Sequence, residues 1–301
     1  MAGEKRSWYY RLSFPRKTAL WGFIFLLPWL LGFLLLFLVP MVQTFQYSFN
    51  QLEIVPTGGI KLTPAGFENF RHALLVDPNF NPALVNTLIE VLLYTPMIII
   101  FSLLCAILLN GKFRGRAVAR AIFFIPIIMA TGLMMERVTN LSGQMQAATE
   151  GEGAVYGAGF IAQLLFNLGI GNQLVQYLLD MVNRIFEIIS LSGIQILIFL
   201  ASLQAISPSL YEVAKIEGAT AYETFWKVTV VMVSPMILTC TIYTMSDLFA
   251  RSDIMTLVYD LAFRQSRYGL SAAMSSIYLL LSVLTISIVV LMLRKVVFYY
   301  D

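Results

Sequence analysis

Polar and ionisable side chains that interrupt long apolar stretches stand out in this 301-residue chain as residues that could do chemistry. Glu90 and Tyr94 are four positions apart, as are Tyr243 and Asp247, so the members of each pair share one face of a helix. A charged group at membrane depth is costly and usually faces a water-filled cavity. Tyrosine with amide and carboxylate partners suits a sugar, whose hydroxyls need both donors and acceptors. The candidate residues for a substrate path are Glu90, Tyr94, Gln195, Tyr243, Asp247 and Arg251.

A second interpretation remains open for the charged members of this set. Glu90, Asp247 and Arg251 could lie at the outer membrane interface, where each would simply be solvated. Catalysis by the chain alone has no support, because the only histidine, His72, has no second histidine, cysteine or carboxylate at metal-ligand spacing. We interpret His72 as a surface residue and predict neither a catalytic set nor a metal site.

The composition indicates a membrane protein. Hydrophobic residues make up 58% of the chain and charged residues 12%, whereas soluble domains have about 25% charged residues. The net charge of +3 is small and the basic residues are dispersed, which argues against nucleic-acid binding. Cys105 and Cys240 fall in apolar stretches and are interpreted as small core residues.

Six apolar stretches are long enough to cross a bilayer as helices, which requires about 20 residues each. A cleaved signal peptide is the competing interpretation of the first stretch, but its apolar part is too long and no small-residue cleavage pattern follows. The predicted spans are 19–45, 83–109, 117–138, 188–206, 228–250 and 272–293.

The distribution of lysine and arginine predicts the orientation, because these residues are enriched on the cytoplasmic side. The larger share of the 20 basic residues falls in 1–18, in the turn after the second span, in the loop beginning at Ser207 and after the last span. Both termini are therefore predicted to be cytoplasmic. Residues 139–187 then form an extracytoplasmic insertion, in which 160–186 is expected to be a helix lying at the membrane interface.

A charged island, SPSLYEVAKIEGATAYETFWKVTVVMVSP, separates the fourth and fifth spans. Pro208 suits the first turn of a helix, with Ser207 as its cap, and a capping box from Ser209 to Glu212 is an alternative start. Gly218 can end this helix in a left-handed conformation. A capping box of Thr220 with Glu223 then begins the next helix. The pattern predicts a helix, a turn and a second helix.

These residues resemble the EAA loop of the permease subunits of binding-protein-dependent ABC importers. The shared pattern is Glu212, small residues, a three-residue gap and Gly218, followed nine residues later by an apolar segment. Val213 and Val231 depart from it, although a later proline is present as Pro235. The segment LQAISPSLYEVAKIEGATAYETFWKV is similar to the carbohydrate-importer branch of these permeases, the maltose-transporter type.

The resemblance implies an all-α, polytopic membrane protein with the six-helix transmembrane domain of a type I ABC importer. Residues 1–18 would be a cytoplasmic segment and 19–301 the transmembrane domain, with the EAA coupling loop at 207–231. The residues expected to couple this chain to an ATPase are Glu212, Ala214, Lys215, Glu217 and Gly218.

The function implied is that of a permease subunit of an ATP-driven importer for a sugar or oligosaccharide in a bacterial-type cytoplasmic membrane. The implied partners are a second permease subunit, two ABC ATPase subunits that carry ATP and Mg²⁺, and an extracytoplasmic solute-binding protein. No cofactor and no enzymatic activity are expected in this chain. The alternative is an ion-coupled secondary transporter or channel that acts without an ATPase and uses Glu90 and Asp247 as coupling carboxylates.

Overall fold

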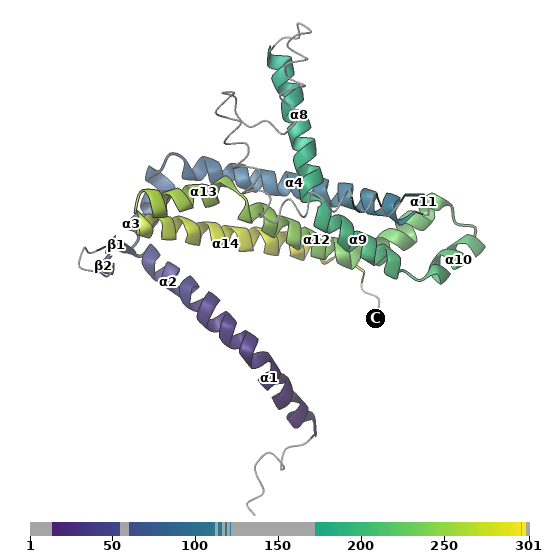
Figure 1. Ribbon diagram of the computed structural model, residues 1–301, viewed down its shortest axis with the longest axis horizontal. Coiled ribbons are helices and arrows are strands. Elements are labelled where there is room, and N and C mark those ends of the chain that lie inside the picture. Colours follow the sequence, from purple (N-terminus) through teal and green to yellow (C-terminus); the bar gives the residue numbers. More distant parts are fainter. Residues whose placement is uncertain are drawn as a thin grey trace, which may run out of the picture. The chain divides into compact units, whose positions relative to one another are not determined.

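The described part of the chain is almost entirely helical, with one small antiparallel hairpin (Figure 1). The computed structural model describes residues 14–54, 60–111, 114–115, 118, 121, 172–295 and 297–298. The chain divides into two compact units. We call residues 1–84 with 253–281 the hairpin unit, and residues 85–252 with 282–301 the helical unit.

The hairpin unit begins with a long apolar helix. α1 (Phe14–Gly32) continues through a π-helical stretch, η2 (Phe33–Leu38), into α2 (Val39–Ser48). This confirms a helix over the first predicted span, but the helix starts earlier than position 19. The side chains of this helix are largely exposed, as expected of a surface that faces lipid or another membrane subunit.

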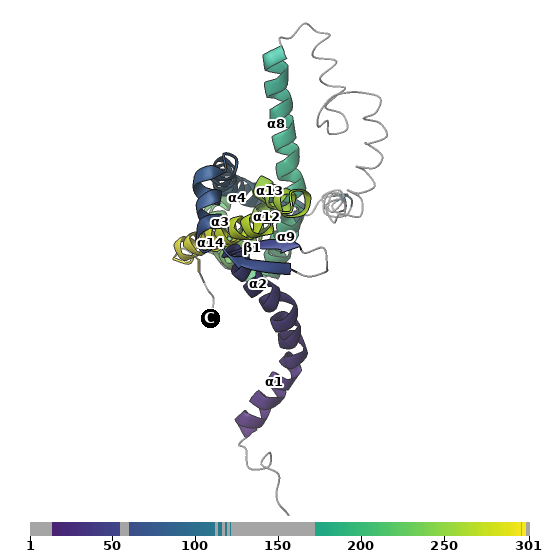
Figure 2. The ribbon, with the colours of Figure 1, turned by 90° about the vertical axis from the view of Figure 1, so that its left-hand side faces the viewer.

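A two-stranded sheet follows, which the all-α prediction did not include. β1 (Asn50–Ile54) pairs antiparallel with β2 (Ile60–Pro64), and Leu52 lies opposite Leu62 (Figure 2). The prediction was wrong here because strands of five residues carry no long apolar run, and long apolar runs are the pattern from which the helices are predicted.

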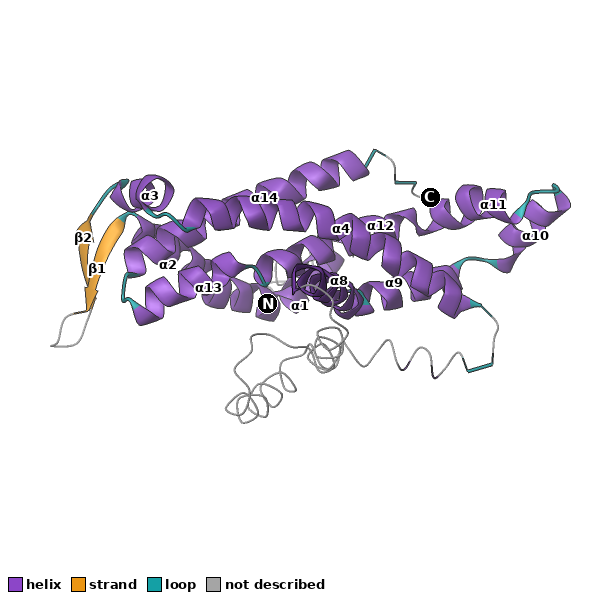
Figure 3. Ribbon diagram, turned by 90° about the horizontal axis from the view of Figure 1, so that it is seen from above, coloured by secondary structure: helices purple, strands orange, loops and turns teal. Residues whose placement is uncertain are grey.

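Short helices connect the hairpin to the next long helix. α3 (Glu68–Arg71) and η3 (His72–Val76) lie close to the strands (Figure 3). Asp77 then caps α4 (Phe80–Asn110), because its Oδ1 accepts hydrogen bonds from the backbone N–H groups of Asn79 (2.9 Å) and Phe80 (3.0 Å). α4 confirms a helix over 83–109 and contributes to both units.

The remainder of the hairpin unit comes from much later in the sequence. α13 (Asp253–Tyr259) and η5 (Asp260–Arg264) precede α14 (Tyr268–Leu293), which also contributes to both units and confirms a helix over 272–293. Ser271 Oγ donates a hydrogen bond to the Val258 carbonyl at 2.8 Å and so joins α14 to α13.

The helical unit has its core where α4, α9 (Gly193–Ala205) and α12 (Val230–Ala250) pack together. In Figure 1, α9 and α12 run side by side. Both cysteines are buried free thiols, and both belong to this core, as the sequence predicted. The core residues are Ile99, Cys105, Ala106, Leu109, Ile196, Phe199, Leu200, Leu203, Ile206, Val233 and Cys240.

The predicted span 188–206 is not one helix. α8 (Asn172–Leu191) ends and α9 begins on either side of a break at Ser192. Ser192 is fully buried, and its carbonyl accepts a hydrogen bond from Ser102 Oγ at 3.4 Å, so the break is held against α4. α8 confirms a helix in the second part of the predicted interface segment, while the remainder of the insertion lies outside the described residues.

Four helices in the described part of the chain have the length and hydropathy to cross a membrane, or five if α9 and the following bent helix count as one span. Apart from positions 118 and 121, the predicted span 117–138 lies outside the described residues. The four helical segments are Trp21–Ser48, Phe80–Asn110, Ala221–Ala250 and Tyr268–Leu293.

Candidate functional site

The charged island folds as the predicted helix, turn and helix. α10 (Pro208–Ile216) is bent by 64° from α9, and α11 (Ala221–Thr224) runs through η4 (Phe225–Thr229) into α12. Pro208 occupies the first turn and Ser207 the cap position. The Ser207 hydroxyl lies 2.8 Å from that of Ser209 and makes no capping bond. A helix start at Ser209 is wrong, because Ser209 already lies inside α10.

The backbone conformation at the end of α10 explains why residue 218 is a glycine. Gly218 has φ +76°, a left-handed conformation that strains any residue with a Cβ. Its N–H donates to the Lys215 carbonyl at 3.1 Å, and the N–H of Ala219 donates to the Ala214 carbonyl at 2.9 Å. This pair of bonds is a Schellman motif, which satisfies carbonyls that the helix end leaves without partners.

The following helix begins as predicted. Thr220 N–H donates to the Glu223 carboxylate at 2.9 Å, and Glu223 N–H donates to Thr220 Oγ1 at 3.3 Å. Glu223 also pairs with Lys227 at 3.6 Å. The two capping motifs fix the turn between α10 and α11 with local bonds.

α10 has one face toward the core and one toward solvent. Ala214 is buried, and the Tyr211 hydroxyl lies 3.3 Å from that of Thr229, which joins α10 to η4. The opposite face carries Ile216, which is 86% exposed although it is apolar. Val213 and Leu210 of the same helix are also exposed, at 51% and 36%, and a group of exposed apolar side chains indicates a contact with another molecule. No pattern in the sequence marks Ile216, because its exposure depends on how the end of the helix is turned.

The polar residues predicted for α10 have distinct places. Glu212, Lys215 and Glu217 are all exposed, whereas Ala214 faces the interior. Lys215 also lines a cavity of 460 Å³ behind α10, whose other walls come from the ends of α4 and α9, from α11 and from η4. The predicted set therefore divides into a buried anchor and an exposed charged surface.

Among the predicted substrate-path residues, Gln195 is only 1% exposed. Its Nε2 donates to Thr244 Oγ1 at 2.8 Å, which links α9 to α12. Its Oε1 is buried and has no hydrogen-bond partner within the described part of the chain. Gln195 thus lies inside the helix packing, where it contacts Thr244.

Asp247 and Arg251 form an ion pair. Nε of Arg251 lies 3.0 Å from each carboxylate oxygen of Asp247. The Arg251 side chain is half exposed and that of Asp247 about one quarter exposed. Tyr243, one turn earlier on α12, is also partly exposed. These three residues lie on one helix face, as predicted. The Arg251 guanidinium pairs with the Asp247 carboxylate and neutralises its charge.

Glu90 and Tyr94 lie on α4, where Glu90 is exposed and Tyr94 partly buried. Two residues of α8 that are not among the predicted site residues, Arg184 and Glu187, interact electrostatically with Tyr94, and Glu187 also interacts with Glu90. Partial desolvation raises the pKa of the Glu187 carboxyl, the Glu90 carboxylate raises it further, and Arg184 opposes this rise. Three cavities of the described residues, of 330, 590 and 460 Å³, are not lined by any of the predicted substrate-path residues of α4 and α12.

Comparison with known proteins gives relatives that cover most of the chain. No protein-family model matches it. The arabinooligosaccharides transport system permease protein AraP of Bacillus subtilis is 29% identical over 97% of this chain and 93% of its own length. The multiple sugar-binding transport system permease protein MsmF of Streptococcus mutans is 27% identical over 85% of this chain and 89% of its own length.

A solved structure shares the fold. It is a bacterial alginate ABC transporter in complex with an alginate pentasaccharide-bound periplasmic protein, and one of its chains matches with a TM-score of 0.63 and 17% identity. The match covers 94% of this chain and 96% of that chain. The resemblance to permeases of ABC sugar importers is confirmed by these relatives.

Proposed function

We propose that this chain is one of two membrane subunits of an ATP-driven importer for a sugar or oligosaccharide. Relatives with sugar-transport names support the substrate class, and the apolar helices support a multi-pass place in the cell membrane. In this proposal the chain forms half of the translocation path and has both termini in the cytoplasm. ATP and Mg²⁺ are bound by two separate ATPase subunits.

The observation that carries the coupling part of the proposal is the exposed apolar tip of α10. Ile216 projects from the end of α10, beside the turn that the two capping motifs fix, and Glu212 and Glu217 are exposed near it. An apolar side chain with carboxylates near it suits a groove on a soluble partner. The groove would bury the apolar group, and basic residues of the partner would pair with the carboxylates. We assign this surface to the ATPase.

Force on α10 would reach the membrane helices by two routes. The hydroxyl contact of Tyr211 with Thr229 joins α10 to the helix that becomes α12, and Tyr211 also packs on the core of the helical unit. The cavity behind α10 gives the helix room to shift. When ATP closes the ATPase dimer, α10 would be carried with it, and the spans would open outward to receive substrate.

The substrate would come from an extracytoplasmic binding protein. The solved relative with a sugar-loaded periplasmic protein supports this kind of partner. Along the path, Tyr243 and Asp247 of α12 and Glu90 and Tyr94 of α4 remain our candidates for contacts with sugar hydroxyls. Gln195 would act through its bond with Thr244, by holding α9 against α12.

The alternative, an ion-coupled transporter acting alone, would need Asp247 free to bind an ion or a proton. Its ion pair with Arg251 disfavours this, because the guanidinium already neutralises the carboxylate that would hold the ion. The alternative also leaves the exposed apolar tip of α10 without a role.

Co-purification with uptake assays tests the proposal. A tagged chain should retain an ATPase and a second permease subunit in detergent, and reconstituted vesicles should import sugar only with internal ATP and external binding protein. Uptake by the pure chain driven by an ion gradient would refute it. Ile216→Asp should abolish retention of the ATPase, whereas Leu75→Asp, which changes an exposed apolar residue of η3 outside the predicted spans, should leave retention intact.

A further inference from the structure

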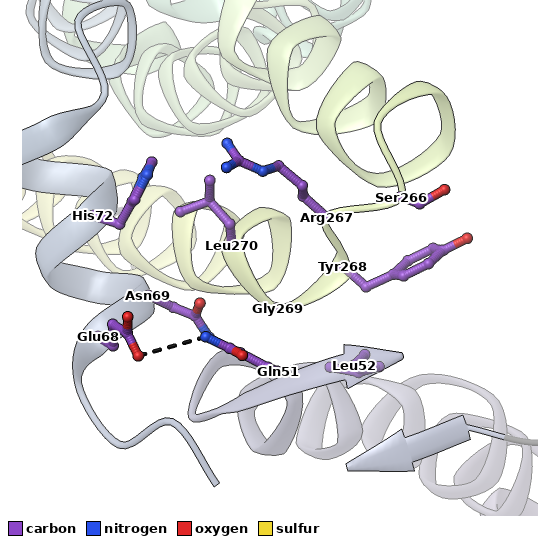
Figure 4. A pocket seen from close by; sticks show the side chains of 10 residues that line it. All are labelled: Gln51, Leu52, Glu68, Asn69, His72, Ser266, Arg267, Tyr268, Gly269 and Leu270. Atoms are coloured by element: carbon purple, nitrogen blue, oxygen red, sulfur yellow. Dashed lines mark hydrogen bonds between the residues drawn. The ribbon is translucent and has the colours of Figure 1, made fainter. Parts of the chain in front are cut away.

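A pocket of 330 Å³ lies within the hairpin unit, between β1, the short helices α3 and η3, and the start of α14 (Figure 4). Cavities that bind small ligands have volumes of about 300–1,000 Å³, so this one is at the small end of the range. None of the residues predicted for ATPase coupling or for the substrate path lines it.

Close packing fixes the walls of this pocket. Asn69 Nδ2 donates hydrogen bonds to the carbonyls of Ser48 and Asn50, both at 3.0 Å, and so ties α3 to the start of β1. Gly269 is essential to this approach, because a Cβ at that position would overlap the Asn50 carbonyl oxygen. The pocket is thus preorganised by segments more than 200 residues apart in sequence.

Polar groups of both signs line the pocket. The Glu68 carboxylate accepts a long hydrogen bond from Gln51 Nε2, at 3.5 Å. The Arg267 guanidinium makes no hydrogen bond or ion pair with any described residue, and Nδ1 of His72 is buried without a partner among those residues. In Figure 4 the His72 and Arg267 side chains flank the same space, with Leu270 between them. His72, which is predicted to be a surface residue, is partly exposed in the wall of this open pocket, with its Nδ1 atom buried.

This lining selects a class of ligand. Because Glu68 and Arg267 have opposite charges, the pocket offers an anion or a cation no net attraction, whereas a neutral ligand loses no hydration of a charge on entering. Hydroxyl groups can donate to Glu68 and accept from Arg267, His72 or Gln51. Leu52 and Leu270 offer apolar surface for C–H groups. Such a mixture of apolar surface with donors and acceptors matches a sugar ring.

We propose that this pocket binds one or two rings of a neutral carbohydrate, as a subsite separate from the translocation path. The assignment of this pocket to the extracytoplasmic side rests on the proposed function and orientation. The proposal that the pocket binds a carbohydrate does not rest on them. An open site with few ligand contacts implies weak affinity, in the millimolar range.

Protection of an introduced cysteine tests this subsite. Ser266 is exposed at the pocket rim, and both natural cysteines are buried. The full chain carrying Ser266→Cys, in isolated membranes, is treated with a maleimide in the presence of maltose or lactose at tens of millimolar. We expect the sugar to slow labelling severalfold. Leu52→Cys, from the opposite wall, is a second reporter, and Leu62→Cys, which does not line the pocket, is the control.

Several results would overturn the proposal. These are no protection of either reporter, equal protection of Leu62→Cys, protection only by the anionic sugar glucuronate, or protection only by a sugar-free binding protein. Combining Ser266→Cys with Arg267→Gln or Glu68→Gln should remove the protection. Protection in membranes that lack an ATPase would support the subsite even if the importer assignment fails, because the assay requires no transport.

Discussion

Ser234 of α12 and Phe298 near the end of the chain are hydrogen-bonded: the Phe298 N–H donates to Ser234 Oγ at 3.0 Å. The same hydroxyl donates to the Val231 carbonyl at 2.7 Å. That carbonyl would otherwise lose its helix partner, because Pro235, four residues later, has no N–H. One serine therefore satisfies the carbonyl that the proline frees and also holds the C-terminal segment against α12.

Ser234→Ala should lower the thermal stability of the purified protein, by about 0.5–1.5 kcal/mol for each hydrogen bond lost. Removal of residues 297–301 should lower the thermal stability by part of the same amount. In a chain that already carries Ser234→Ala, the same removal should lower the stability little further. Ser246→Ala is the matched control, because Ser246 Oγ makes only an exposed bond to the Ile242 carbonyl. Equal melting temperatures for wild type and Ser234→Ala would contradict this role.

Gly218→Val should uncouple ATP hydrolysis from transport while the chain still inserts and assembles. No atom lies within 4 Å of a Cβ added at this position, so the expected effect comes from the left-handed backbone, at about 1–2 kcal/mol. Substrate-stimulated ATPase activity and uptake in vesicles are the measurements. Gly66→Val imposes a similar strain, with φ +57°, in the hairpin unit, and should leave coupling intact. Normal coupling in Gly218→Val would show that the turn is not the coupling element.

Gly269→Ala should destabilise the hairpin unit by about 1–3 kcal/mol, because the methyl group overlaps the Asn50 carbonyl and forces α14 away from β1. Gly22→Ala, where the Cβ would meet no atom within 4 Å, should be neutral or slightly stabilising. Thermal unfolding of the two variants, followed in the same detergent, tests this. An unchanged melting temperature for Gly269→Ala would mean that the close approach does not occur.

Asp247→Ala should retain assembly and basal ATP hydrolysis but lose most uptake. The ion pair adds a decisive control: if Asp247 serves only to neutralise Arg251, the double variant Asp247→Ala, Arg251→Ala should restore uptake. If Asp247 binds sugar, the double variant should remain impaired. The matched pair Asp260 and Arg264, which has the same spacing at 3.2 Å in η5, should tolerate neutralisation.

Residues 139–187 were predicted to face outward, and a cysteine at position 154 tests this. Ala154→Cys should react with a membrane-impermeant thiol reagent in intact cells, or in spheroplasts where an outer layer blocks access. A cysteine at Lys215 should react only after the cells are opened. The reverse labelling pattern would show that the chain has the opposite orientation in the membrane.

The sequence by itself determined the features that depend on neighbouring residues. The capping box of Thr220 with Glu223 and the turn at Gly218 could be predicted because each needs only a few consecutive residues. Long helices over 19–45, 83–109, 228–250 and 272–293 followed from apolar runs, since lipid leaves a chain segment few alternatives to a helix.

Only the tertiary structure decided which distant residues meet. Gln195 and Thr244 are 49 positions apart, and Ser234 and Phe298 are 64 apart. No local pattern specifies such pairs, since they result from how whole helices pack. The exposure of Ile216 likewise depends on the 64° bend after α9. The pocket beside His72 exists because Gly269 lacks a side chain where α14 passes the Asn50 carbonyl, a steric fit that a single sequence does not contain.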